Sequence, residues 1–105
     1  MENKIFVILL RYTVDNEMIE HHLKEHNHFL DVNYAKEIFL ASGAQHPRTG
    51  GVIFAKAQSR EELSKLLEHD PFYCHHCAEY QIYEFNPTKY SSEFGQFMKD
   101  TGLRL

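Results

Sequence analysis

An unbroken apolar run near the start of the chain, residues 5–10, constrains the fold more than any other feature. It has the length of a strand, and Arg11 and the turn-prone residues 13–16 bound it. Because the run shows no alternation with polar residues, it predicts a strand that is buried on both faces.

The segment that follows predicts a helix whose apolar residues share one stripe. Steps of four, three, four and four separate the members of this stripe, which are Ile19, Leu23, His26, Leu30 and Tyr34. The helix is expected to begin between residues 16 and 22 and to end near residue 36. His26 then points inward, whereas His28 lies about 200° around the helix and points to solvent.

A second helix has clear signals at both ends. Ser59 and Glu62 have the spacing of a capping box, in which each side chain pairs with the backbone of the other. The helix is expected to stop by Asp70, because Pro71 disfavours the helical conformation for the residue before it. Asp70 is thereby held in an extended conformation just past a helix.

Three further strands complete the pattern. Residues 38–43 and 51–56 are expected to form a hairpin around the loop 45–50. Residues 79–85 alternate polar with aromatic or aliphatic side chains, the period of a half-buried strand, and Pro87 ends it. The order β-α-β-β-α-β predicts an α+β, ferredoxin-like sandwich, with a four-stranded antiparallel sheet and helices on one face.

We expect one domain over residues 1–105, with a core at about 4–87 and an extension, 88–105, that contains a short helix. A four-stranded sheet that is covered on one face also predicts a homodimer, with Tyr80, Ile82 or their alternates on the other face. The net charge of −4 argues against nucleic acid and anionic membranes as partners. Two cysteines and the lack of a signal or spanning segment favour the cytoplasm.

The predicted topology gathers distant residues at one edge of the sheet. These residues are Arg11, Ser42, Gly50, Gly51 and Asp70, and His26 joins them if its helix starts late. A carboxylate that accepts from one imidazole nitrogen leaves the other nitrogen free as a general acid or base. The same His26–Asp70 bond could instead be structural, tying the two helices together.

The other candidate site residues could each have a functional role or a simpler, non-functional one. Arg11 could clamp an anionic group and Ser42 could donate beside it, or both could simply face water. The motif His22-x-x-Glu25-His26 matches an inverted zincin pattern but lacks an evident third ligand. The segment Cys74-His75-His76-Cys77 has metal-binding side chains without a second ligand pair. We therefore expect no native metal and no cofactor.

The sequence resembles the YciI-like, or YCII-related, family of small ferredoxin-like proteins. The resemblance spans residues 6–87 and is carried by Val7-Ile8-Leu9 with Arg11, His26-Asn27-His28-Phe29-Leu30, Leu40-Ala41-Ser42-Gly43, Thr49-Gly50-Gly51, Asp70-Pro71-Phe72 and Ala78-Glu79-Tyr80-Gln81-Ile82. It implies a homodimer of the dimeric α/β barrel type and an active site on a His-Asp pair, here His26 and Asp70. The family includes a class that looks like a dehydrochlorinase of a chlorinated hydroxyhydroquinone. Glu37 stands where the family commonly has glycine, Ala44 where it has proline, and His76-Cys77 where Gly-Leu is usual.

Together these features favour a small-molecule enzyme that uses His26 and Asp70 for general acid/base chemistry, such as elimination or hydrolysis. Arg11, Ser42, Gly50 and Phe72 are the candidate substrate-binding residues. A non-catalytic small-molecule-binding module and a purely structural dimer remain alternatives. An open cavity against the imidazole would favour catalysis or binding, whereas a filled site would favour the structural role.

Overall fold

The computed structural model describes residues 3–103, so residues 1–2 and 104–105 of the expected domain and extension lie outside it. Its elements confirm the predicted order, including the short helix of the extension, and add one short helix that was not predicted. They are β1 (Lys4–Tyr12), α1 (Asn16–Ala35), β2 (Phe39–Ala44), β3 (Gly50–Ala57), α2 (Arg60–Leu67), α3 (Pro71–Cys74), β4 (Ala78–Phe85) and α4 (Ser92–Asp100).

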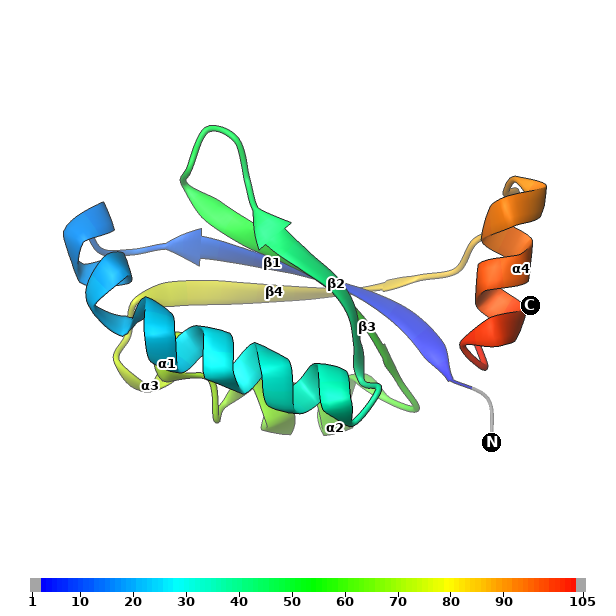
Figure 1. The fold of residues 1–105 in the computed structure, drawn as a ribbon, viewed down its shortest axis with the longest axis horizontal. Helices are drawn as coiled ribbons and strands as arrows, with labels where there is room; N and C mark the ends of the chain where they lie inside the picture. The colour runs from blue at the N-terminus through cyan, green and yellow to red at the C-terminus, as the bar shows by residue number, and fades with distance from the viewer. Residues whose placement is uncertain (1–2, 104–105) are drawn as a thin grey trace.

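The four strands form one sheet in the order β2-β3-β1-β4, and every neighbouring pair is antiparallel. This is the ferredoxin-like arrangement that the sequence predicts. Figure 1 shows α1 and α2 together on one side of the sheet, with α4 beyond its far end. None of the helices within residues 3–103 is long and apolar enough to span a membrane.

The central strand β1 is less buried than its sequence suggests. Phe6, Ile8 and Leu10 are buried on the helix side, but Val7 and Leu9 on the other side are only half-buried. The prediction of burial on both faces is therefore wrong for the single chain. When the residues on both faces of a strand are apolar, the sequence does not show that one face is packed and the other is open.

Both main helices begin at capping side chains. Asp15 accepts a hydrogen bond from the backbone N–H of Met18 at 3.0 Å, so α1 begins at the early end of the expected interval. Ser59 accepts from the N–H of Glu62 at 3.2 Å, which confirms the predicted start of α2. Because α1 begins early, His26 lies in the middle of the helix rather than in its first part.

The helix α4 packs against the end of the sheet, as expected for the extension. Met98 and Leu103 are buried there against Ile5. The Lys56 ammonium donates to the carbonyl of Thr101 at 2.7 Å, which further fixes the segment after α4.

At two positions this sequence has another residue where the resembling family commonly has glycine. The backbone conformation at both positions favours glycine. Glu37 has φ of 60° just after α1, and His76 has φ of 55° just after α3. In this left-handed region a Cβ atom crowds the backbone, at a cost of roughly 1 to 2 kcal/mol. Glycine is the usual residue here because it lacks that atom.

We expect Glu37→Gly to stabilise the protein by about 1 kcal/mol, because it relieves this crowding at the end of α1. Lys36→Gly is the matched control, since Lys36 has a φ of −81° and gains nothing from glycine. Chemical denaturation at one protein concentration measures both. Equal destabilisation by the two substitutions would contradict the prediction.

Candidate active site

His26 and Asp70 meet beneath the sheet, although 43 residues separate them in the chain. His26 is only 8% exposed, and Asp70 is fully buried. The His26 Nδ1 atom lies 2.7 Å from the Asp70 Oδ1 atom. Since an ionised carboxylate only accepts, Nδ1 carries the hydrogen, and Nε2 of the neutral ring carries the lone pair.

Asp70 is held by the chain on either side of it. Its backbone is extended, with φ of −67° and ψ of 127°, as the following proline predicts. Its Oδ1 also accepts from the backbone N–H of Phe72 at 3.0 Å, so Asp70 is the N-cap of α3. The carboxylate is thereby fixed before it contacts the imidazole.

Tyr80 is a third member of this cluster that the sequence analysis did not identify. Its hydroxyl donates to Asp70 Oδ2 at 2.5 Å. Burial raises the pKa of Tyr80 far above its ordinary value, and the charge of Asp70 raises it further, so the hydroxyl keeps its proton. The sequence analysis put Tyr80 and Ile82 or their alternates on the dimer face. The structure packs these two against the helix-side core and leaves Tyr83 and Phe85 on the open face.

Phe72 fixes the plane of the imidazole. The two rings stack with centroids 3.9 Å apart and planes 6° from parallel. With Nδ1 bound to Asp70 and one ring face covered, Nε2 is the nitrogen left for a ligand. Within residues 3–103, no hydrogen bond engages it.

A cavity of about 310 Å³ opens beside His26. Its wall is mainly apolar and includes Leu10, Leu23 and Phe72. Ser42 contributes a hydroxyl, which lies 2.6 Å from the hydroxyl of Tyr34. The structure thus brings His26, Ser42 and Phe72 together around one space that a small molecule could enter.

Arg48 is the cation that borders this cavity, and the sequence analysis did not identify it. Its guanidinium lies 2.7 Å from the carboxylate of Glu20 on α1. The hydrogen bond to Glu20 raises the pKa of Arg48 above its ordinary value, so the side chain stays charged. An anionic group on a ligand in this cavity could pair with the Arg48 guanidinium.

Arg11 and Gly50 are placed elsewhere, which corrects two expectations. Arg11 forms an exposed ion pair with Glu79 on the opposite face of the sheet, because Leu10 and Tyr12 take the helix side. Gly50 is buried against β1, and its neighbour Gly51 lines the cavity instead. Gly50 thus packs against the backbone of β1 and does not line this cavity.

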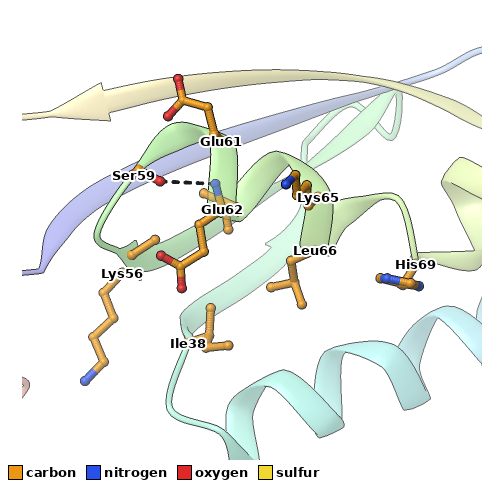
Figure 2. A pocket seen from close by; sticks show the side chains of 10 residues that line it. Ile38, Lys56, Ser59, Glu61, Glu62, Lys65, Leu66 and His69 are labelled. Carbon is orange, nitrogen blue, oxygen red and sulfur yellow. Dashed lines mark hydrogen bonds between the residues drawn. The ribbon is translucent and has the colours of Figure 1, made fainter.

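A larger cavity, of about 570 Å³, lies between α2 and the end of β3. Figure 2 shows Ile38 and Leu66 in it, with Lys56, Glu62 and other charged side chains around them. It contains no buried acid/base pair. We therefore assign the candidate active site to the smaller cavity, where the oriented imidazole is.

Comparison with known families matches residues 5–86 to the YCII-related domain. The chain belongs to the YCII-related family. This assignment confirms the resemblance that the sequence motifs carry. None of the curated proteins compared with this YCII-related chain matches it.

Solved structures with a similar fold include two enzymes. One is the 5-chloro-2-hydroxyhydroquinone dehydrochlorinase of Burkholderia phenoliruptrix AC1100 in complex with 2,5-dihydroxybenzoquinone, with a TM-score of 0.68, 16% identity and coverage of 78% of this chain and 93% of that chain. The other is SnoaB, a cofactor-independent oxygenase of Streptomyces nogalater, with a TM-score of 0.49, 12% identity and coverage of 88% of this chain and 99% of that chain. The likeness to the dehydrochlorinase, at 16% identity, shows a shared fold alone, and the ferredoxin-like fold predicted for this YCII-related chain is confirmed.

Proposed function

We propose that this protein is a homodimeric enzyme that uses His26 as a general acid or base on a small phenolic or carboxylated molecule. One observation carries the proposal. His26 Nδ1 is bound to the buried Asp70, and the same ring borders an open cavity. A purely structural histidine would instead lie against filled space, so the cavity favours a functional role.

The chemistry that suits this arrangement is a proton transfer. Asp70 fixes the tautomer and stabilises the imidazolium that forms when Nε2 takes a proton. In a dehydrochlorination, Nε2 would take a proton from the substrate while the C–Cl bond breaks and chloride leaves. One proton and one chloride are released per turnover, so the step needs no oxidant. Arg48 and Ser42 line the same cavity and would hold an anionic or phenolic oxygen of the substrate.

The similar dehydrochlorinase suggests the first substrates to test, because its structure holds 2,5-dihydroxybenzoquinone, a small dihydroxybenzoquinone. We expect chlorinated hydroxyhydroquinones to release chloride stoichiometrically when the protein is added, as measured by ion chromatography. Saturable binding in the His26 cavity without chloride release or other turnover across the panel would favour the non-catalytic binding module instead.

The homodimer is the part of the proposal that rests on the open face of the sheet. Phe54, Tyr83 and Phe85 are 43%, 51% and 47% exposed there. Val7 pairs with Phe54 on one side and with Tyr83 on the other, so these side chains form one apolar patch. A second copy of the chain would cover it.

We expect the parent protein to sediment as a dimer at micromolar concentration and Tyr83→Glu to sediment as a monomer, because the new charge would be buried in an apolar interface. Met18→Glu is the control, since Met18 is equally exposed but lies at the start of α1. A monomeric parent would remove the dimer from the proposal.

The cytoplasm is the proposed compartment. Cys74 and Cys77 are both free thiols, as expected in a reducing environment.

A further inference from the structure

Two residues of one metal-like motif, His22 and Glu25, and one residue of the other, His75, come together in the fold. His22 and Glu25 lie on α1, and His75 lies at the C-terminal end of α3. One potential ligand atom from each side chain lies within 4.8 Å of the other two. The sequence analysis treated the two motifs separately and therefore expected no metal.

The geometry of α1 explains why His22 and Glu25 group with His75 rather than with His26, the third residue of the inverted zincin motif. Residues three apart on a helix are surface neighbours, so His22 and Glu25 share one face of α1. His26 completes the motif in sequence, but its ring is turned inward to Asp70 and stacked on Phe72. His22 is thereby left to pair with a histidine from another element.

His75 is held in place before any ion binds. Its backbone N–H donates to the carbonyl of Pro71 at 3.0 Å, and the Thr13 hydroxyl donates to the carbonyl of His76 at 2.9 Å. Its ring stacks on His22 with centroids 4.0 Å apart and planes 13° from parallel. Nitrogens bound to one tetrahedral zinc lie about 3.3 Å apart, and each lone pair lies in the plane of its ring, so one of the two stacked rings would turn when an ion binds.

The set of side chains is chemically suited to a borderline transition-metal ion. Two imidazoles and one carboxylate are a common zinc-binding set, and three protein ligands leave a fourth position for water.

We propose that His22, Glu25 and His75 form a binding site for one zinc-type divalent ion per chain. The two thiols of the 74–77 segment are not part of it. The thiol of Cys74 donates to the carbonyl of Glu68 at 3.3 Å, and that of the buried Cys77 donates to the carbonyl of His75 at 3.7 Å. The ion would link α1, which carries His26, to the C-terminal end of α3, whose N-cap is Asp70.

The test uses full-length protein without a polyhistidine tag, because a tag would bind the same ions. Metal is removed with a chelator, and zinc is then titrated by calorimetry, with cobalt absorption as a second probe. We expect one site per chain, binding at least about tenfold weaker in His22→Ala, Glu25→Gln and His75→Ala, and parental binding in His28→Ala. His28 is the matched control because it is an exposed histidine on the same helix.

Thermal unfolding gives an independent readout. Zinc should raise the unfolding midpoint of the parent and of His28→Ala but not that of His75→Ala, because only an ion at this site links the two helices. The chelated protein should remain folded, since the fold has its own core. The proposal is overturned if zinc does not bind saturably, or if His28→Ala weakens binding as much as His75→Ala does.

Discussion

Replacing His26 by glutamine is expected to lower turnover by on the order of a hundredfold or more, the contribution typical of a positioned general acid or base. Glutamine roughly keeps the volume and can still hydrogen-bond to Asp70, but it cannot carry a proton between substrate and solvent. Chloride release from the substrates proposed above measures the effect. Circular dichroism and sedimentation check that the variant folds and assembles as the parent does.

Asp70→Asn should give a comparable loss of turnover and a larger loss of stability. The buried Asp70 accepts from His26, from the Phe72 backbone and from Tyr80, and an amide has only one accepting oxygen. We expect a loss of about 1 to 3 kcal/mol in the free energy of unfolding. The carboxylate also stabilises the imidazolium, which the neutral amide does not do.

Tyr80→Phe separates the two roles of this cluster. It removes the hydrogen bond to Asp70 Oδ2 and leaves the contact between Asp70 and His26. We expect about 1 kcal/mol of destabilisation and a decrease in rate of less than about tenfold. If both dyad variants lose stability, couple strongly in a double-mutant cycle and retain full turnover, the pair is structural.

Gly50→Ala is expected to cost about 3 kcal/mol or more of stability, the largest such effect in the sheet. An added Cβ at Gly50 would lie 1.8 Å from the carbonyl oxygen of Leu10. That oxygen belongs to the backbone of the central strand, so it cannot move aside without disturbing the pairing of β1 with β3. Urea denaturation of parent and variant at one protein concentration measures the difference.

Gly43→Ala is the matched control for this prediction. Gly43 lies on β2 in the same sheet, and nothing lies within 4 Å of a Cβ built there. We expect its free energy of unfolding to stay within about 0.5 kcal/mol of that of the parent. Equal destabilisation by the two substitutions would show that loss of glycine, rather than the close approach of β1, is responsible.

Local signals account for what the sequence predicted correctly. The capping box correctly predicted the start of α2, and Pro71 predicted the extended conformation of Asp70. The apolar stripe predicted that His26 points inward. The short helix α3 was missed, although Asp70 followed by proline is also a typical helix start.

The face on which a strand residue lies was harder to predict. The run 5–10 is apolar on both sides, so it did not reveal that Leu10 faces the helices and Arg11 the opposite side. Tyr80 can reach Asp70 only if it lies on the helix side of β4, and the sequence did not show on which side of β4 it lies. Arg48 reaches the cavity from a loop, and loop geometry is set by contacts distant in sequence.

The central claim is that the Nε2 atom of His26 is the reactive group of an open site. Nitrogen-15 NMR of the histidine rings during titration with 2,5-dihydroxybenzoquinone, the ligand of the similar dehydrochlorinase, tests it most directly. We predict that Nε2 of His26 shifts saturably while Nδ1 keeps its proton toward Asp70. A contradictory result would be an unchanged His26 resonance with shifts confined to the ring nitrogens of His69, which lines the cavity of Figure 2.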